Sequence, residues 1–162
     1  MGVYWRGAIA ALAVTAAGCI SEDPGPVGVT PYRLCPFRID SSMTEPAAVY
    51  EAVSRFNEIA RRLVFVERPD GVPIISRPLG GRVGEAHYKT PAIYIDEAVS
   101  VSVWGDRAFD HKVVVLMHEL GHIVGMRHVE AEGGIMFPIL TVDSRWTPSD
   151  QFECVRVGIC HL

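Results

Sequence analysis

Residues 118–128, HELGHIVGMRH, place three histidines and one glutamate in an otherwise apolar segment. On a helix, His118 and His122 are one turn apart and project from the same face. Both imidazoles can therefore direct a ring nitrogen at one ion, at the roughly 2.0–2.1 Å that zinc adopts with histidine. Unpartnered polar rings are costly to bury among apolar side chains. The spacing therefore predicts a zinc site rather than a set of core histidines.

Two further residues of this segment suit the same site. Gly125 permits a left-handed turn, so the chain can leave the helix and bring His128 back as a third ligand. Three neutral imidazoles leave a fourth position for water, which is the open coordination of catalytic zinc. Glu119 is offset by about 100° from His118 around the helix, so it reaches that water rather than the metal. We therefore expect Glu119 to act as general base on a zinc-bound water, whose pKa the metal lowers to roughly 7.

The segment resembles the extended zinc signature of the metzincin metalloproteases, H-E-x-x-H-x-x-G-x-x-H, at all five fixed positions. Metzincins also have a methionine turn beneath the zinc, and GIMFP at 134–138 is similar to the matrixin form of that turn. The resemblance implies a matrixin-like catalytic domain with one catalytic zinc ion. The roles that it implies are zinc ligation by His118, His122 and His128, catalysis by Glu119, and a hydrophobic floor formed by Met136.

The sequence departs from the family pattern in three respects. Val129, after the third histidine, matches none of the residues that distinguish the well-known metzincin families. Pro138 stands two residues past Met136, where some families have a tyrosine ligand, so oxyanion stabilisation would fall to the zinc and to backbone donors. Structural calcium or a second zinc is not evident, and His87 is interpreted as a surface or strand histidine.

The resemblance also implies how a substrate binds. In matrixin-like enzymes the peptide lies along an edge strand, which is a general mode of peptide recognition. The segment after the methionine turn walls the pocket just beyond the scissile bond. By this analogy an apolar substrate side chain would be enclosed by Pro138, Ile139, Leu140 and Thr141.

The expected function is therefore a zinc-dependent endopeptidase that acts on peptides or proteins, as a monomer. Two alternatives stay open. One is a surface lipoprotein that binds metal or a protein partner through a non-catalytic site. The other is a zinc amidase acting on a non-protein substrate, because a fold-level analogy does not determine the substrate.

The elements that position the zinc segment follow from hydrophobic periodicity and capping residues. Three helices are expected, over 45–62, 111–124 and from 148 onward, with Thr44, Asp110 and Thr147 as their N-caps. Strands are expected at 37–40, 63–67, 72–76 and 92–96, and the stretch 80–90 is expected to be irregular. Strands and helices alternate early and helices dominate late. We therefore expect an α+β fold with an α/β-like N-terminal half, a mixed four- or five-stranded sheet and three helices. With the zinc signature, this describes a metzincin-like zincin domain.

Residues 1–18 resemble a bacterial lipoprotein signal peptide. One cation, Arg6, precedes the apolar run AIAALAVTAA, which is shorter than the roughly 20 residues of a membrane span. The run closes with AAGC, similar to a lipobox, although Ala16 stands where leucine is usual. In such lipoproteins the cysteine, here Cys19, carries the lipid; the alternative is an ordinary signal peptide cut near Gly18. Either interpretation places the mature protein outside the cytoplasm, and the first predicts a lipid anchor at the cell envelope or surface.

The chain of 162 residues is long enough for one domain with a core. We interpret residues 19–33, with the lipidated cysteine, as a Pro/Gly-rich tether and residues 34–162 as the catalytic domain. The net charge of −4 argues against a nucleic-acid partner, because no basic stripe exists to release counterions.

With Cys19 lipidated, three cysteines remain in an oxidising compartment. One disulfide and one free thiol are the simplest outcome. Cys154 and Cys160 are close enough in sequence to pair, whereas a bond from Cys35 to either would join the start of the domain to its end. The pairing stays open.

Overall fold

The computed structural model describes residues 20–21, 33–87 and 89–161. The predicted signal peptide, the lipidation site Cys19 and most of the tether lie outside the described residues. Within the described part, none of the helices is both long enough and apolar enough to cross a membrane.

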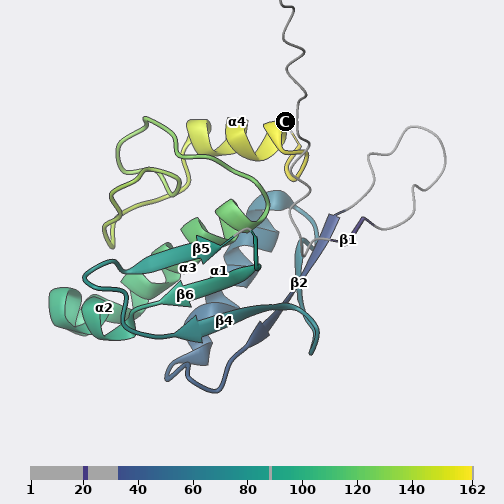
Figure 1. The fold of residues 1–162 in the computed structure, drawn as a ribbon. Coiled ribbons are helices and arrows are strands. Elements are labelled where there is room, and N and C mark those ends of the chain that lie inside the picture. Colours follow the sequence, from purple (N-terminus) through teal and green to yellow (C-terminus); the bar gives the residue numbers. More distant parts are fainter. Residues whose placement is uncertain (1–19, 22–32, 88, 162) are drawn as a thin grey trace, which may run out of the picture.

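A mixed sheet forms one layer of the domain (Figure 1). Five strands lie in the order β3-β2-β4-β6-β5, and β5 alone of these runs antiparallel to its neighbour. Their bounds are Arg33–Ile39 (β2), Phe65–Glu67 (β3), Val72–Ser76 (β4), Gly84–His87 (β5) and Ala92–Ile95 (β6). A two-residue strand, β1 (Ile20–Ser21), pairs antiparallel with the start of β2.

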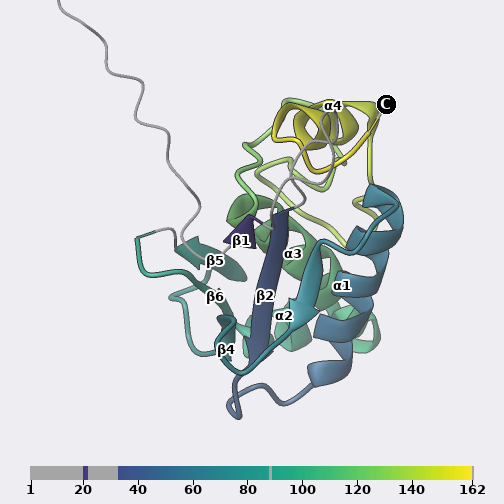
Figure 2. The ribbon, with the colours of Figure 1, turned by 90° about the vertical axis from the view of Figure 1, so that its right-hand side faces the viewer.

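Helices form the second layer, on one face of the sheet (Figure 2), except for the last helix, which lies at the top of Figure 1 and Figure 2 and away from that face. Their bounds are Pro46–Ala60 (α1), Glu97–Trp104 (α2), Ala108–Ile123 (α3) and Pro148–Arg156 (α4), with a short 3-10 turn at Gly105–Arg107. The core lies between the sheet and the pair α1 and α3. The strands contribute Phe37, Ile74 and Ile93 to it, and the helices contribute Phe56 and Leu116. Burial of each such side chain stabilises the fold by about 1.5–3 kcal/mol relative to exposure.

The expected α+β class and mixed sheet are confirmed, but two elements differ from the predictions. The stretch predicted to be irregular contains β5, whose weak strand signal, GEAH, is overridden by pairing with β6. Helix α2 was not predicted, because the β-branched residues of EAVSVSVW have low helix propensity. Its N-cap Asp96 accepts a hydrogen bond from the backbone N–H of Val99 at 3.2 Å, which favours the helix locally.

Two predicted N-caps are wrong. Helix α1 begins without a side-chain cap of its own. Instead the buried Glu97 carboxylate accepts the backbone N–H groups of Thr44 at 3.0 Å and Glu45 at 3.2 Å, so a distant residue satisfies these donors. Helix α3 begins at Ala108, which leaves Asp110 inside its first turn. The third prediction is correct, since Thr147 caps α4 by accepting from the N–H of Asp150.

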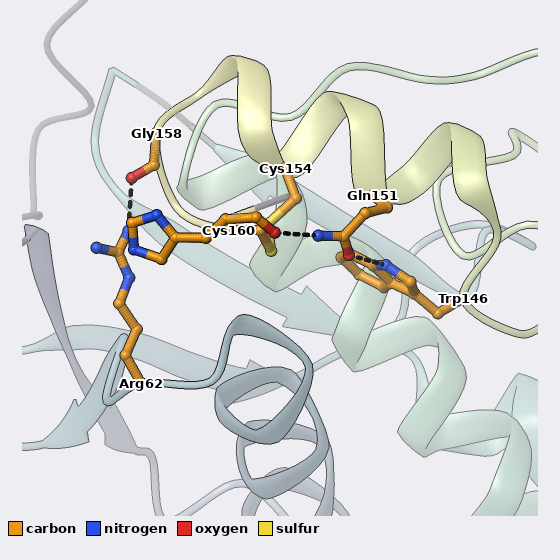
Figure 3. Close-up of a disulfide and its surroundings, with 7 residues drawn as sticks. Arg62, Trp146, Gln151, Cys154, Gly158 and Cys160 are labelled. Carbon is orange, nitrogen blue, oxygen red and sulfur yellow. Dashed lines mark hydrogen bonds between the residues drawn. A yellow bond between two sulfur atoms is a disulfide. The ribbon is translucent and has the colours of Figure 1, made fainter.

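A disulfide between Cys154 and Cys160 closes the C-terminal end of α4 (Figure 3). Both cysteines are buried. The segment that follows α4 is also attached to the turn after α1, because the Arg62 guanidinium donates to the carbonyl of Gly158 (Figure 3). Cys35 is disulfide-bonded as well, so no cysteine among the described residues is a free thiol.

Candidate active site

Helix α3 and the turn after it bring three histidines together. His118 and His122 project from the last two turns of the helix, which ends at Ile123. Gly125 then adopts a φ of +93°, a left-handed conformation that favours glycine. This turn reverses the chain and returns His128 to the other two imidazoles.

The three Nε2 atoms form a compact triangle. The distance between Nε2 atoms is 3.0 Å from His118 to His122, 3.1 Å from His122 to His128 and 3.2 Å from His118 to His128. Nitrogens bound tetrahedrally to zinc at 2.0–2.1 Å are about 3.3 Å apart, so the triangle has the size that zinc requires. No other cluster of metal-binding side chains is found in the described ranges.

Backbone carbonyls orient two of these rings. Nδ1 of His118 donates to the carbonyl of Ile135 at 2.6 Å, and Nδ1 of His122 donates to that of Met126 at 3.0 Å. A carbonyl can only accept, so both Nδ1 atoms carry the proton and both Nε2 lone pairs face the centre. Burial lowers the pKa of His118 to about 4 and also lowers the pKa of His122. The lowered pKa values favour the neutral form of these two rings near pH 7, which is the form that binds a metal.

Glu119 lies beside the cluster without being part of it. Its side chain is buried between α3 and the edge strand β5. Burial raises the pKa of this carboxyl to about 7 and the charge of Glu85 adds to the effect, whereas a hydrogen bond from the backbone of Ala86 opposes it. A carboxyl group poised near neutrality in a cleft can both accept and release a proton.

The approach of β5 to this carboxylate requires a glycine. A Cβ atom at Gly84 would lie 2.6 Å from Oε1 of Glu119 and 2.6 Å from Cγ1 of Val115. Both contacts are shorter than real Cβ atoms make. Residue 84 therefore determines how closely the strand covers the glutamate.

Met136 packs against α3, the helix that carries His118 and His122 (below, the zinc helix), and it is fully buried. A Cβ atom at Gly121 would lie 2.5 Å from the sulfur of Met136, so this glycine allows the close packing. The carbonyl of Met136 accepts the N–H of Val129, one residue after the third histidine, at 3.0 Å. The methionine turn thus supports the chain that carries His128.

Asp150 supports this turn, although sequence reasoning assigned it no role. Its fully buried carboxylate accepts the N–H groups of Ile135 and Met136 at 3.1 and 2.8 Å. It also forms the capping box of α4 with Thr147. The pattern Thr-x-x-Asp at a helix start signals this box, but not the contact with the methionine turn.

The histidines and Glu119 open into a cleft of about 760 Å³ between β5 and the segment after the methionine turn. Three of the predicted pocket residues line it: Pro138, Ile139 and Leu140. Thr141 does not, because the chain turns there and its N–H donates to Oγ of Ser144 at 3.0 Å. His87 lies on β5, 2.8 Å from Glu85, and is not part of the histidine cluster.

A solved structure of a zinc-dependent peptidase from Methanocorpusculum labreanum has a similar fold. The two chains superpose with a TM-score of 0.51 at 12% sequence identity, over 73% of this chain and 98% of that one. The likeness at this identity concerns the fold, which is that of the zincin-like peptidases. Among curated proteins, none matches this sequence.

The family follows from the sequence between β4 and α4. The matrixin family model matches residues 73–153, which is half of the chain and includes the edge strand, the zinc helix and the methionine turn. The chain belongs to the matrixin family, and it is a zinc metallopeptidase.

Proposed function

We propose that this protein is an endopeptidase in which Glu119 acts as the general base. The observation that carries the proposal is the position of this carboxylate, buried beside three converging imidazoles but not part of their cluster. A site that only stored zinc would have no need of a buried carboxylate next to its ligands, because such burial destabilises the charged form.

The chemistry divides between the metal and the protein. His118, His122 and His128 would hold zinc, which would supply Lewis-acid activation of water and of the substrate carbonyl. Glu119 accepts a proton from the attacking water and returns it to the amine that leaves. The raised pKa of about 7 suits both transfers, because the group changes protonation readily at neutral pH.

The shape of the cleft supports an extended peptide as substrate. Among the strands that the structure describes, β5 is the last of the sheet and pairs with β6 along one edge only. Its other edge can accept a peptide as an added strand, bonded through backbone groups. Pro138, Ile139 and Leu140 form an apolar wall of the cleft. We expect an apolar substrate side chain to pack against this wall.

The test compares wild-type protein with Glu119→Ala and with Glu132→Ala, a matched control at an exposed glutamate that does not line the cleft. A mixed peptide library is digested and zinc content is measured for each protein. Wild type and the control should cleave, while Glu119→Ala should lose about 10²–10⁴-fold in rate and keep its zinc. Full activity in Glu119→Ala would refute its role as base. Cleavage of cell-wall material by the wild type, with no peptide cut, would favour the amidase.

We also propose that the domain works as a monomer outside the cytoplasm, anchored through a lipid on Cys19. The disulfide between Cys154 and Cys160 suits an oxidising compartment. A sulfur that carries a lipid thioether cannot also form a disulfide. The intact mass of protein purified from membranes therefore distinguishes a lipidated Cys19 from a disulfide-bonded Cys19. A mass without acyl chains would refute the anchor. Light scattering of the domain checks the monomer.

A further inference from the structure

Four ionisable carboxyl and guanidinium side chains line the cleft: Arg82, Glu85, Glu119 and Arg127. Two of them compensate each other, since the Arg82 guanidinium lies 3.1 Å from the Glu85 carboxylate. Glu119 is the buried base described above. The Arg127 guanidinium is exposed, and within the described residues it makes no ion pair or hydrogen bond.

The backbone at Arg127 is nevertheless firmly held. Its N–H donates to Oε1 of Glu153 on α4 at 2.7 Å. The same carboxylate is paired with Arg156, whose Nε and guanidinium nitrogen lie 2.7 and 2.6 Å from its two oxygens. The nearby acid is therefore already neutralised by another arginine. Residue 127 is fixed at the cleft wall. The charge of Arg127 helps to lower the pKa of Glu153, but Arg156 is the larger cause and takes the side-chain hydrogen bonds of that carboxylate, so the guanidinium donors of Arg127 stay available to a ligand.

An arginine in this situation is suited to a carboxylate ligand. The planar guanidinium offers two parallel N–H donors that match a carboxylate in a bidentate bond. A substrate peptide in the cleft passes Arg127, which directly precedes the ligand His128 in sequence.

We propose that Arg127 binds an acidic side chain of the substrate, so that the enzyme selects peptides with Asp or Glu at the position facing this residue. The inference rests on the proposed peptidase function and adds a substrate class to it. The apolar wall would hold one substrate residue, and Arg127 would select a second one by charge.

The test uses Arg127→Gln, which removes the charge, and Arg127→Glu, which reverses it. Arg68→Glu is the matched control: an exposed arginine away from the cleft with the same change in net charge. Peptide libraries vary each position among Asp, Asn, Ala and Lys, and kcat/KM is measured. For wild type and the control, kcat/KM should be about 10-fold or more higher with Asp than with Asn at one position. This ratio corresponds to the free energy of a hydrogen bond between charged groups. Arg127→Gln should lose this preference and Arg127→Glu should prefer Lys.

A binding measurement keeps the two proposals separable. Fluorescent peptides with Asp or Asn at each position are titrated into Glu119→Ala protein with and without Arg127→Glu. Tighter binding of the Asp peptide, lost on charge reversal, supports the inference even if no protein cleaves. Cleavage by wild type with the same profile in Arg127→Glu overturns the inference and leaves the peptidase standing. Absence of cleavage in wild type overturns the proposed function, and binding alone then decides the role of Arg127.

Discussion

The carboxylate of Asp150 accepts the backbone N–H of Met136 at 2.8 Å, and so connects α4 to the methionine turn. Its other oxygen accepts the N–H of Ile135 at 3.1 Å. The carbonyl of Ile135 in turn orients the His118 ring through Nδ1 at 2.6 Å. One buried acid at the start of the last helix therefore reaches a histidine of the cluster through a single residue.

Replacement of this acid should weaken both stability and metal binding. Asp150→Ala leaves two buried N–H groups without an acceptor, at a cost of about 1–3 kcal/mol each. Zinc affinity should fall about 10-fold, as for other partners that orient ligands. Urea unfolding and zinc titration measure the two effects, and Ser149→Ala, at an exposed neighbour, is the control. Zinc affinity equal to wild type in folded Asp150→Ala would contradict this linkage.

Gly84→Ala should reduce kcat by about 100-fold, the typical loss when a catalytic group is displaced by about 1 Å. The new methyl group would lie 2.6 Å from the Glu119 carboxylate and must displace it. Zinc content should not change, because the imidazoles are not touched. The double variant Gly84→Ala/Val115→Ala relieves only the second close contact, so it should remain slow. Recovery of activity in that double variant would show that Val115, and not Glu119, is what the glycine accommodates.

Glu119→Gln should stabilise the metal-free protein above pH 7. Burial raises the folded-state pKa of Glu119 to about 7 from its ordinary value of 4.5. The folded state thus holds a proton that the unfolded state releases, and stability falls as pH rises through this window. At about 1.4 kcal/mol per pKa unit, the carboxyl costs about 3 kcal/mol at pH 8.

Chemical denaturation of metal-free wild type and Glu119→Gln at pH 4 and pH 8 measures this difference. The variant should gain at pH 8 and differ little at pH 4. An equal difference at both pH values would show that ionisation of Glu119 is not its cause.

Zinc removal by a chelator should lower the melting temperature, and added zinc should restore it. Ligand binding to the folded state contributes about 4 kcal/mol at a concentration 1,000 times Kd. His122→Ala, which leaves two ligands, should show a much smaller zinc-dependent shift. Calorimetry with and without zinc checks this expectation. A shift of the same size in the variant would place the zinc elsewhere.

Replacement of Cys154 and Cys160 together by alanine should cost about 2 kcal/mol, as expected for a short disulfide loop of sequence separation 6. Zinc affinity should stay near the wild-type value, because Asp150 lies one turn before Cys154 and is held by its own hydrogen bonds. Urea unfolding and zinc titration of the double variant test both statements. A large loss of zinc affinity would mean that the disulfide, and not the capping box, positions Asp150.

Local chemistry made the zinc site predictable from the sequence. The helical period alone places His118 and His122 on one face, and the left-handed preference of Gly125 lets His128 return. The capping box makes the start of α4 predictable in the same way, because its donor and acceptor are three residues apart. Each of these features depends on residues within about one helical turn.

The sequence by itself determined the cluster of three histidines, the position of Glu119 beside it and the α+β class. Tertiary structure decided what reaches the site from a distance: strand β5, whose pairing with β6 outweighs its weak local preference, and the buried acid Asp150. It also decided that Arg127 lines the cleft while Arg156 takes the side-chain hydrogen bonds of the nearby Glu153. These features depend on contacts between segments far apart in the chain, and local propensity holds no information about which segments will meet.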